Sequence, residues 1–370
     1  MNPLDLARPE IRALQPYSSA RMEASGGGVW LNANESPWPP FSGNDGWNRY
    51  PDPQPAALRA RMAALYGVEP DQLLIGRGSD EGIDLLVRAF CAARRDAIMI
   101  SPPTFGMYAT CARVQGADIV EVPLGCDFTL DVDAVLAAMT PAVKLVFVCS
   151  PNNPAGAGVA RADILHLAAA LEDRALLVVD EAYVEFVEPC GDFGSVTELM
   201  DAHANLVVLR TLSKAWALAG VRMGCVLADA RVIALLRKIM PPYPLPAPCI
   251  EASLHTLADD GERAMRERVA AILRERARMR NELAALACVR EVLPSQTNFL
   301  AARFVDAGAA YAALLAAGVV VRDVRRYPPL GDALRISIGT PAENDRVLAT
   351  LGGLADIAGA SAGMRVELPA

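Results

Sequence analysis

The stretch Arg210-Thr-Leu-Ser-Lys214-Ala-Trp-Ala-Leu-Ala-Gly-Val-Arg222 decides the fold of this chain, and it follows directly on the apolar run Leu206–Leu209. Upstream, a second apolar run, Leu176–Val179, ends at Asp180. A lysine at a strand end can form a Schiff base with an aldehyde cofactor, and a buried carboxylate can keep a pyridine nitrogen protonated. Each residue alone is more often structural, as part of a surface turn or a strand end. Together with the motifs below, the pair indicates a site for pyridoxal 5'-phosphate (PLP).

Composition excludes several classes of protein. With 370 residues the chain can bury a large core, and we expect one large domain and one smaller domain. The formal net charge is −8 and no block of like charges occurs, so we expect no nucleic-acid partner. The eight cysteines lack close C-x-x-C spacing and the three histidines are scattered, which predicts reduced thiols and no metal site.

The N-terminus and the hydropathy pattern predict the compartment. Residues 1–10 have neither the basic start nor the apolar core of a secretory signal. No apolar run approaches the roughly 18–20 residues of a membrane span. We therefore expect a cytoplasmic protein without membrane contact.

Short apolar runs alternate with amphipathic helical segments from about Pro53 onward. Runs of this length between helices are typical of parallel strands that are buried on both faces. This pattern predicts a large α/β domain over residues 46–245, with a mostly parallel central sheet flanked by helices. The expected strands are Gln72–Ile75, Ala97–Ile100, Lys144–Cys149, Leu176–Val179, Leu206–Leu209 and Met223–Leu227.

The remaining segments predict an arm, a second domain and a tail. Residues 1–50 are rich in Gly, Pro, Asn and Trp and suggest an extended arm, of which we assign 1–45 to packing on the small domain or a partner subunit. The proline-rich stretch Met240–Pro248 marks a boundary. Beyond it we expect a smaller α+β domain over 246–358 and a fraying tail over 359–370. Its expected elements are a helix, Gly261–Leu286, and strands Asn298–Arg303, Val319–Arg322 and Ala333–Ile338.

A candidate anion site precedes the second helical segment. The residues Gly76-Arg-Gly-Ser-Asp80 follow a strand and open a helix, so backbone amides near Gly78, Ser79 and Asp80 would face a phosphate. The alternative is a helix cap at Ser79 or Asp80. Ser213 and Arg222 flank Lys214 and could complete the phosphate site, since arginine binds oxyanions in a bidentate manner.

Three further motifs place polar or aromatic groups at strand ends. In Ser150-Pro-Asn-Asn-Pro154, a turn, Asn153 could donate to the phenolic oxygen of the cofactor, and Tyr183 could reach the same atom unless it is a buried core aromatic. Tyr108 could stack on a planar ring, although core packing is an equal alternative. Arg335 alternates within an apolar strand and needs an anionic partner, for which a substrate carboxylate or phosphate is suitable.

In this order along nearly the whole chain, the motifs resemble those of the fold-type I, class II PLP-dependent aminotransferases. The matching segments are Pro16-Tyr17, Leu31-Asn-Ala-Asn-Glu35, Arg49-Tyr-Pro51, Arg77-Gly-Ser-Asp-Glu81, Pro102-Pro-Thr-Phe-Gly-Met-Tyr108, Ser150-Pro-Asn-Asn-Pro154, Val179-Asp-Glu-Ala-Tyr183, Leu209-Arg-Thr-Leu-Ser-Lys214, Pro242-Tyr-Pro-Leu245, Thr297-Asn-Phe299 and Leu334-Arg-Ile-Ser-Ile-Gly-Thr340.

The resemblance implies a role for each matching residue. Lys214 would be the Schiff-base lysine and proton shuttle, and Asp180 the partner of the pyridinium. The other cofactor-binding residues would be Gly78, Ser79, Asp80, Tyr108 stacked on the ring, Asn153, Tyr183, Thr211, Ser213, Arg222 and, from the neighbouring subunit of a homodimer, Tyr50. The substrate-binding residues would be Tyr17, Asn32, Asn153, Arg322 and Arg335.

The resemblance also implies substrates. It points to transamination of L-histidinol phosphate with 2-oxoglutarate, giving imidazole-acetol phosphate and glutamate in histidine biosynthesis. Phe105, Ala155 and the segment Ser36-Pro-Trp38 depart from the usual residues on the entrance side, so three alternatives stay open. They are transamination of aromatic amino acids, decarboxylation of threonine phosphate, and a catalytically silent module that only binds a partner.

Overall fold

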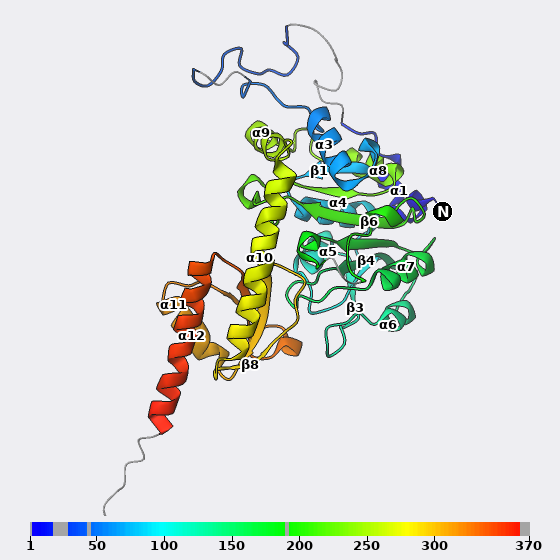
Figure 1. Ribbon diagram of the computed structural model, residues 1–370. Helices are drawn as coiled ribbons and strands as arrows, with labels where there is room; N and C mark the ends of the chain where they lie inside the picture. Colours follow the sequence, from blue (N-terminus) through cyan, green and yellow to red (C-terminus); the bar gives the residue numbers. More distant parts are fainter. Residues whose placement is uncertain (1, 18–28, 43–45, 189–191, 363–370) are drawn as a thin grey trace, which may run out of the picture.

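The computed structural model describes residues 2–17, 29–42, 46–188 and 192–362, which form two sheets with their covering helices (Figure 1). The larger sheet has seven strands in the order β1-β7-β6-β5-β4-β2-β3. Their bounds are β1 Leu73–Gly76, β2 Ala97–Ile100, β3 Asp118–Glu121, β4 Val143–Cys149, β5 Leu176–Asp180, β6 Leu206–Thr211 and β7 Gly224–Leu227.

The prediction of a mostly parallel central sheet is confirmed, with one strand as an exception. Strands β2 to β6 pair in parallel, whereas β7 is antiparallel to both β6 and β1. The expectation that Met223–Leu227 is parallel is therefore wrong. The connection from β6 to β7 contains no α-helix, and a parallel crossover normally needs one, so the strand returns antiparallel. Sequence patterning also missed the edge strand β3, whose residues are only partly buried.

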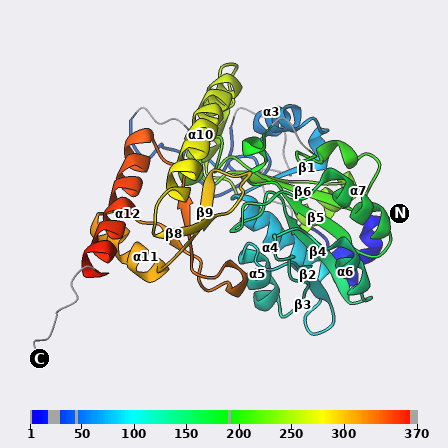
Figure 2. The ribbon, with the colours of Figure 1, turned by 60° about the horizontal axis from the view of Figure 1, so that its bottom comes forward.

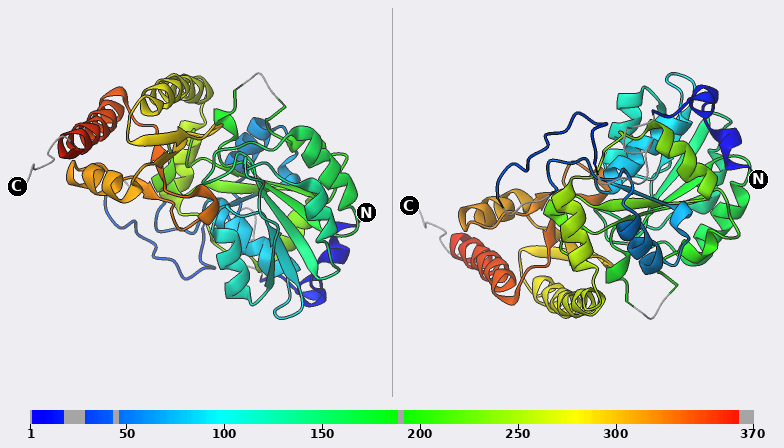
Figure 3. Two further views of the ribbon diagram at one scale, coloured as in Figure 1. Left: turned by 90° about the horizontal axis from the view of Figure 1, so that it is seen from below. Right: turned by 90° about the horizontal axis from the view of Figure 1, so that it is seen from above.

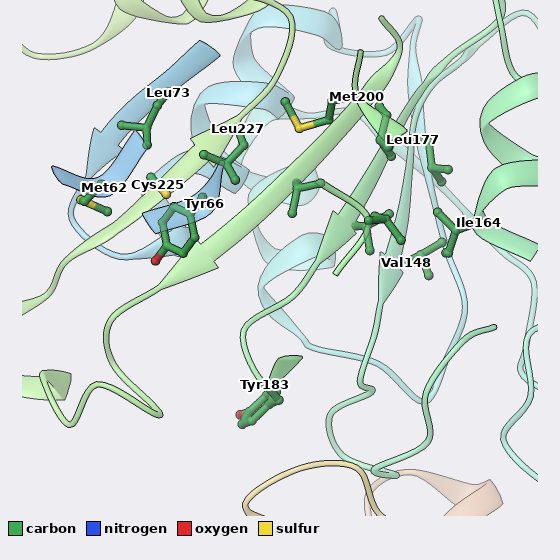
Figure 4. Close-up of a cluster of buried hydrophobic side chains, with 14 of the residues drawn as sticks. Met62, Tyr66, Leu73, Val148, Ile164, Leu177, Tyr183, Met200, Cys225 and Leu227 are labelled. Carbon is green, nitrogen blue, oxygen red and sulfur yellow. The ribbon is translucent and has the colours of Figure 1, made fainter. Parts of the chain in front are cut away.

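Helices cover both faces of this sheet, as Figures 1 and 3 show. On one face, side chains such as Met62, Leu177 and Met200 form a buried cluster, part of which is drawn in Figure 4. On the other face Phe90 and Leu236 belong to a second cluster. The helices between the N-terminal segment and the second sheet are α3 Ala56–Tyr66, α4 Ser79–Phe90, α5 Met107–Gln115, α6 Val132–Ala137, α7 Arg161–Ala170, α8 Ala230–Ile239 and α9 Ala247–Thr256.

The start of the chain is packed rather than extended. A 3-10 turn, η1 (Pro3–Leu6), and helix α1 (Pro9–Ala13) lie on the layer that contains α4 and α8. The backbone N–H of Arg8 donates to the carbonyl of Ala89 at 3.0 Å, and Lys238 Nζ donates to the carbonyl of Arg12 at 2.7 Å. The expectation of an extended arm is wrong for these residues, whereas the described residues between 29 and 50 carry no helix or strand.

The second sheet has four antiparallel strands in the order β10-β11-β9-β8, and Figure 2 shows it beside helices α10 to α12. Of the expected strand Val319–Arg322 only Arg322 belongs to a strand, and β8 was not predicted. Helix α12 continues into the expected tail as far as Ala362; residues 363–370 lie outside the described residues. The elements are α10 Gly261–Ala284, β8 Val289–Val292, β9 Phe299–Phe304, α11 Ala307–Ala316, β10 Arg322–Asp323, β11 Ala333–Ser337 and α12 Pro341–Ala362.

A buried arginine joins the two sheets. Arg276 on α10 donates to the carbonyl of Phe186 at 3.1 Å, to the carbonyl of Thr297 at 2.8 Å and to the Glu188 carboxylate at 2.8 Å. These contacts connect the helix, the segment that precedes β9 and the loop beyond β5. Within the described ranges, no helix combines the length and the apolar character that crossing a membrane requires.

Candidate active site

A cavity of about 790 Å³ lies at the carboxyl ends of β4, β5 and β6, closed on its far side by the small sheet. Ligand sites are expected at this edge of an open α/β sheet. Eleven of the predicted site residues line it: Ser79, Asp80, Asn153, Asp180, Tyr183, Thr211, Ser213, Lys214, Arg222, Arg322 and Arg335.

The N-terminus of α4 forms one end of the cavity. Gly78 caps the helix with φ +79°, a conformation that favours glycine, and a Cβ atom there would lie 2.8 Å from Arg222 Nη2, so the guanidinium would have to shift. Arg222 donates to Asp80 Oδ2 at 3.2 Å and to Ser213 Oγ at 3.4 Å. Amides of a helix N-terminus, a hydroxyl and a guanidinium thus converge as an anion site.

Asp180 ends β5 and is almost completely buried. Its Oδ2 accepts a hydrogen bond from the Tyr108 hydroxyl at 2.7 Å, and its Oδ1 accepts from the Ala182 backbone N–H at 3.1 Å. Burial raises the pKa of this carboxyl to about 6, although both hydrogen bonds act in the opposite direction. A buried carboxylate that is costly to ionise is stabilised by a cation placed against it.

Lys214 follows β6 and lies on the same side of the cavity. Burial, and then the charge of Arg335, lower the pKa of its amine. Its Nζ lies 5.6 Å from the centre of the Tyr183 ring. The amine is therefore easier to deprotonate than a surface lysine, as a base in proton transfer must be.

Three predicted residues, Asn153, Tyr183 and Arg335, contact one another in the cavity. Asn153 Nδ2 donates to the Tyr183 hydroxyl at 3.4 Å, and its Oδ1 accepts from Arg335 Nη1. The Arg335 guanidinium lies 5.1 Å from the centre of the Phe299 ring, and its buried Nε has no hydrogen-bond partner. Figure 4 shows Tyr183 apart from the other labelled side chains, beyond the strand ends. An arginine with an unused buried donor can accept an anion.

The structure places Tyr108 differently from the expectation that its ring stacks on the cofactor. The side chain is fully buried, is stacked on Phe147 at 4.7 Å with an interplanar angle of 13°, and is not among the residues that line the cavity. Its hydroxyl instead satisfies Asp180. Phe105, in edge-to-face contact with Tyr108 at 5.7 Å, lines the cavity in its place.

Other predicted residues lie outside this cavity in the single chain. Gly78 is the N-cap of α4, directly before the cavity-lining residues Ser79 and Asp80. Tyr50 stacks on Tyr243 at 4.2 Å beside a separate hollow, and its side chain is 46% exposed. Tyr17 is 71% exposed, and Asn32 is also at the surface. The structure of one chain therefore does not bring Tyr50, Tyr17 and Asn32 to Lys214.

Sequence patterning missed two groups that the cavity exposes. Arg326 and Tyr327, in the turn after β10, line it together with Arg322. Arg113 on α5 lies on the far rim. Arg322 and Arg326 lie four residues apart in the sequence, and this closeness of two arginines was a signal of an anion-binding surface.

Comparison with known proteins agrees with this geometry. Residues 29–351 match the profile of the family described as aminotransferase class I and II, and the chain belongs to this family of PLP-dependent enzymes. Within it, the chain is 54% identical to the histidinol-phosphate aminotransferase of Stenotrophomonas maltophilia and 53% to that of Xylella fastidiosa, in each case over 94% of this chain and 96% of the relative. A solved histidinol-phosphate aminotransferase from Sinorhizobium meliloti, in complex with pyridoxal-5'-phosphate, superposes with a TM-score of 0.76 at 28% identity over 84% of both chains.

The residues present fit PLP. The anion site around Gly78 and Arg222 suits a phosphate, the buried carboxylate of Asp180 suits a protonated ring nitrogen, and Lys214 offers an amine for an aldehyde. All three groups border one cavity. The missing Cβ of Gly78 leaves the Arg222 guanidinium in the position where it completes this anion site.

Asp180→Asn tests the carboxylate through stability as well as activity. Because burial raises the folded pKa to about 6, ionising Asp180 opposes folding, and this cost appears as the pH rises from about 4 through 6. Without cofactor, the free energy of unfolding of the variant should therefore exceed that of wild type by about 2–3 kcal/mol at pH 7.5 and differ little from it at pH 4. Urea titrations at both pH values measure this.

The same variant should lose activity despite its greater stability. An amide cannot carry the charge that holds a protonated ring nitrogen, and loss of such an electrostatic contact lowers kcat by about 10²–10³. Asp229→Asn, which removes a carboxylate outside the cavity, is the control for activity. Equal stability of Asp180→Asn and wild type across the pH range would contradict the assigned cost of burial.

Proposed function

We propose that this protein catalyses PLP-dependent transamination of L-histidinol phosphate with 2-oxoglutarate, giving imidazole-acetol phosphate and glutamate, in histidine biosynthesis. The observation that carries the proposal is the arginine-rich wall of the cavity, with Arg322 and Arg335 facing the Lys214 side. Histidinol phosphate carries a phosphate and 2-oxoglutarate carries two carboxylates, and guanidinium groups bind phosphate and carboxylate oxygens in the same bidentate manner. Relatives of the chain named histidinol-phosphate aminotransferase support this choice of amine.

The side chains would divide the work as follows. When bound, PLP supplies an electron sink that stabilises negative charge on the substrate carbon. Lys214 Nζ would take the proton from that carbon and deliver it to the former aldehyde carbon of the cofactor, since its lowered pKa favours the free amine. Asp180 would hold the ring nitrogen, and Asn153 and Tyr183, which already share a hydrogen bond, would bind the phenolic oxygen.

The phosphate and substrate ends use separate groups. The cofactor phosphate would be held by Ser79, Ser213 and Arg222. The Ser213 backbone N–H donates to Thr211 Oγ1 at 3.1 Å, which fixes the position of this serine. Arg322 and Arg335 would bind the anionic end of the substrate. One anion site would hold the cofactor and the other the anionic end of the substrate. The substrate would therefore be oriented with its reacting carbon toward Lys214.

We also propose a cytoplasmic homodimer in which Tyr50 reaches the cavity of the partner subunit. The arm that carries Tyr50 exposes large apolar side chains, which a second copy of the chain would cover. They include Val29, Leu31, Trp38 and Phe41, exposed by 78%, 85%, 76% and 55%. This arrangement would explain why Tyr50, Tyr17 and Asn32 do not reach the cavity within one chain.

A substrate panel tests the proposed reaction. Enzyme loaded with PLP is mixed, without a keto acid, with histidinol phosphate, phenylalanine or phosphothreonine, and the products of a single turnover are identified by mass spectrometry. We expect rapid formation of imidazole-acetol phosphate, in an amount equal to the active sites, and at least about tenfold slower conversion of phenylalanine. Faster conversion of phenylalanine would instead indicate an aromatic aminotransferase, and carbon dioxide from phosphothreonine a decarboxylase.

A further inference from the structure

The wall of the cavity that comes from the small sheet carries three arginines. Arg322 on β10 lies directly opposite Arg335 on β11 in the strand register. Arg326 follows four residues later and lines the same cavity. The pKa of Arg335 is lowered, chiefly by burial, and the charges of Arg322 and Arg326 lower it further, which reflects their proximity. This wall concentrates more positive charge than a single carboxylate requires.

The part of the chain that the structure describes supplies no ion-pair partner to these three arginines. Among the described residues, no carboxylate oxygen lies within 4.0 Å of a guanidinium nitrogen of Arg322, Arg326 or Arg335. The acidic residue next in the chain, Asp323, instead pairs with Arg325 at 2.6 Å. Arg325 does not line the cavity, whereas Arg326 does. The two neighbouring arginines therefore differ in both charge partner and position.

Arg326 is also held in place before any ligand binds. Its Nη2 donates to the Tyr327 hydroxyl at 2.9 Å, and its guanidinium lies 4.9 Å from the centre of the same ring. The Tyr327 hydroxyl in turn donates to the Thr104 carbonyl at 3.4 Å, across the cavity from the small sheet to the large one. A guanidinium restrained in this way loses less conformational entropy when an anion binds.

The two proposed substrates place different demands on this wall. A phosphate monoester carries a charge of about −1.5 to −2 on three terminal oxygens at pH 7. Each carboxylate of glutamate carries a single charge on two oxygens, for which one guanidinium is sufficient. Building on the proposed function, we propose that Arg326 determines specificity by binding the phosphate of the amine substrate as an additional guanidinium that the carboxylates of glutamate do not need.

The test compares Arg326→Gln with Arg325→Gln in the PLP-loaded enzyme. For Arg326→Gln we expect the KM for histidinol phosphate to rise about 10- to 100-fold with kcat within about twofold, because a charge-assisted hydrogen bond is lost. The KM for glutamate and the rate with phosphate-free histidinol should change by less than about threefold. Arg325→Gln should leave all of these values unchanged, and Arg326→Lys should recover part of the loss.

Inhibition by inorganic phosphate provides a second readout that does not need histidinol phosphate as a substrate. In the glutamate half-reaction, Arg326→Gln should raise the inhibition constant of phosphate by about tenfold or more, unlike Arg325→Gln. Equal behaviour of the two variants, or an equal rise in the KM for glutamate, would overturn the role of Arg326. Failure of wild-type enzyme to convert histidinol phosphate would overturn the proposed function instead, while phosphate inhibition would still decide the role of Arg326.

Discussion

Replacing Lys214 by alanine is expected to reduce turnover by at least about 10⁴-fold, which removes measurable activity in an ordinary assay. Lys214 follows β6 and lines the cavity together with Asp180 and Tyr183, and burial lowers the pKa of its amine. Alanine leaves the cavity and its two anion sites intact but removes the atom that would carry the proton. The loss should therefore appear in kcat rather than in the KM for either substrate.

Folding and rescue separate this effect from structural damage. Burying the Lys214 amine lowers its pKa, so the charged side chain opposes folding, and Lys214→Ala should be at least as resistant to urea as wild type. A small primary amine in the buffer should restore part of the rate by occupying the vacated space. Lys144→Ala, at the other end of β4, should retain full activity. Near-normal turnover of Lys214→Ala would exclude its assigned role.

Much of the site could be predicted because it depends on local sequence. Lys214 and Asp180 each follow a buried apolar run, and the carboxyl ends of neighbouring parallel strands meet at one edge, so strand ends alone bring them together. The anion site at Gly78 was predictable for the same reason, since a helix that starts after a strand presents its amides there. Strand direction was less predictable, because the reversal of β7 depends on the length of its connection rather than on its own residues.

Sequence patterns predict neither side-chain conformations nor contacts between subunits. Tyr108 follows the expected strand end, but its ring packs on Phe147 and its hydroxyl reaches Asp180, a choice set by residues 39 and 72 positions away in the chain. A single chain does not bring Tyr50 to the cavity, so its proposed role depends on the proposed homodimer. The arginines near Arg322 indicated an anion-binding surface in the sequence, but that Arg326 lines the cavity without a nearby carboxylate is seen only in the three-dimensional contacts.

A buried ion cluster directly beneath the catalytic strand ends was also overlooked. Arg210 on β6 donates to Glu181 at 3.1 Å and to Glu185 at 2.8 Å, and its guanidinium lies 4.5 Å from the centre of the Tyr66 ring. The rule applied to Arg335, that a cation within an apolar strand needs a partner, also applied to Arg210. Glu181 follows Asp180 and Arg210 precedes Lys214 by four residues, so the cluster fixes the two strand ends that carry the chemistry.

Arg210→Ala is expected to lower the free energy of unfolding by about 3–5 kcal/mol at pH 7.5, because two carboxylates remain buried without their cation. Burial already raises the pKa of Glu181, and only the charge of Arg210 and local hydrogen bonds oppose this rise. Without Arg210 the pKa rises further, so the variant binds more protons when folded than when unfolded. The destabilisation should therefore shrink as the pH falls and Glu181 becomes protonated.

Urea unfolding of the cofactor-free protein at pH 5 and 7.5, at one protein concentration, measures both effects. Arg263→Ala removes an arginine that pairs with Asp260 and Glu267 at 3.1 Å on an exposed helix face, and should cost less than about 1 kcal/mol at either pH. Adding Glu181→Gln to Arg210→Ala should recover part of the loss at pH 7.5, since one unpaired charge is then absent. A loss in Arg210→Ala that is independent of pH and unaffected by Glu181→Gln would mean that packing against Tyr66, rather than charge, makes Arg210 important.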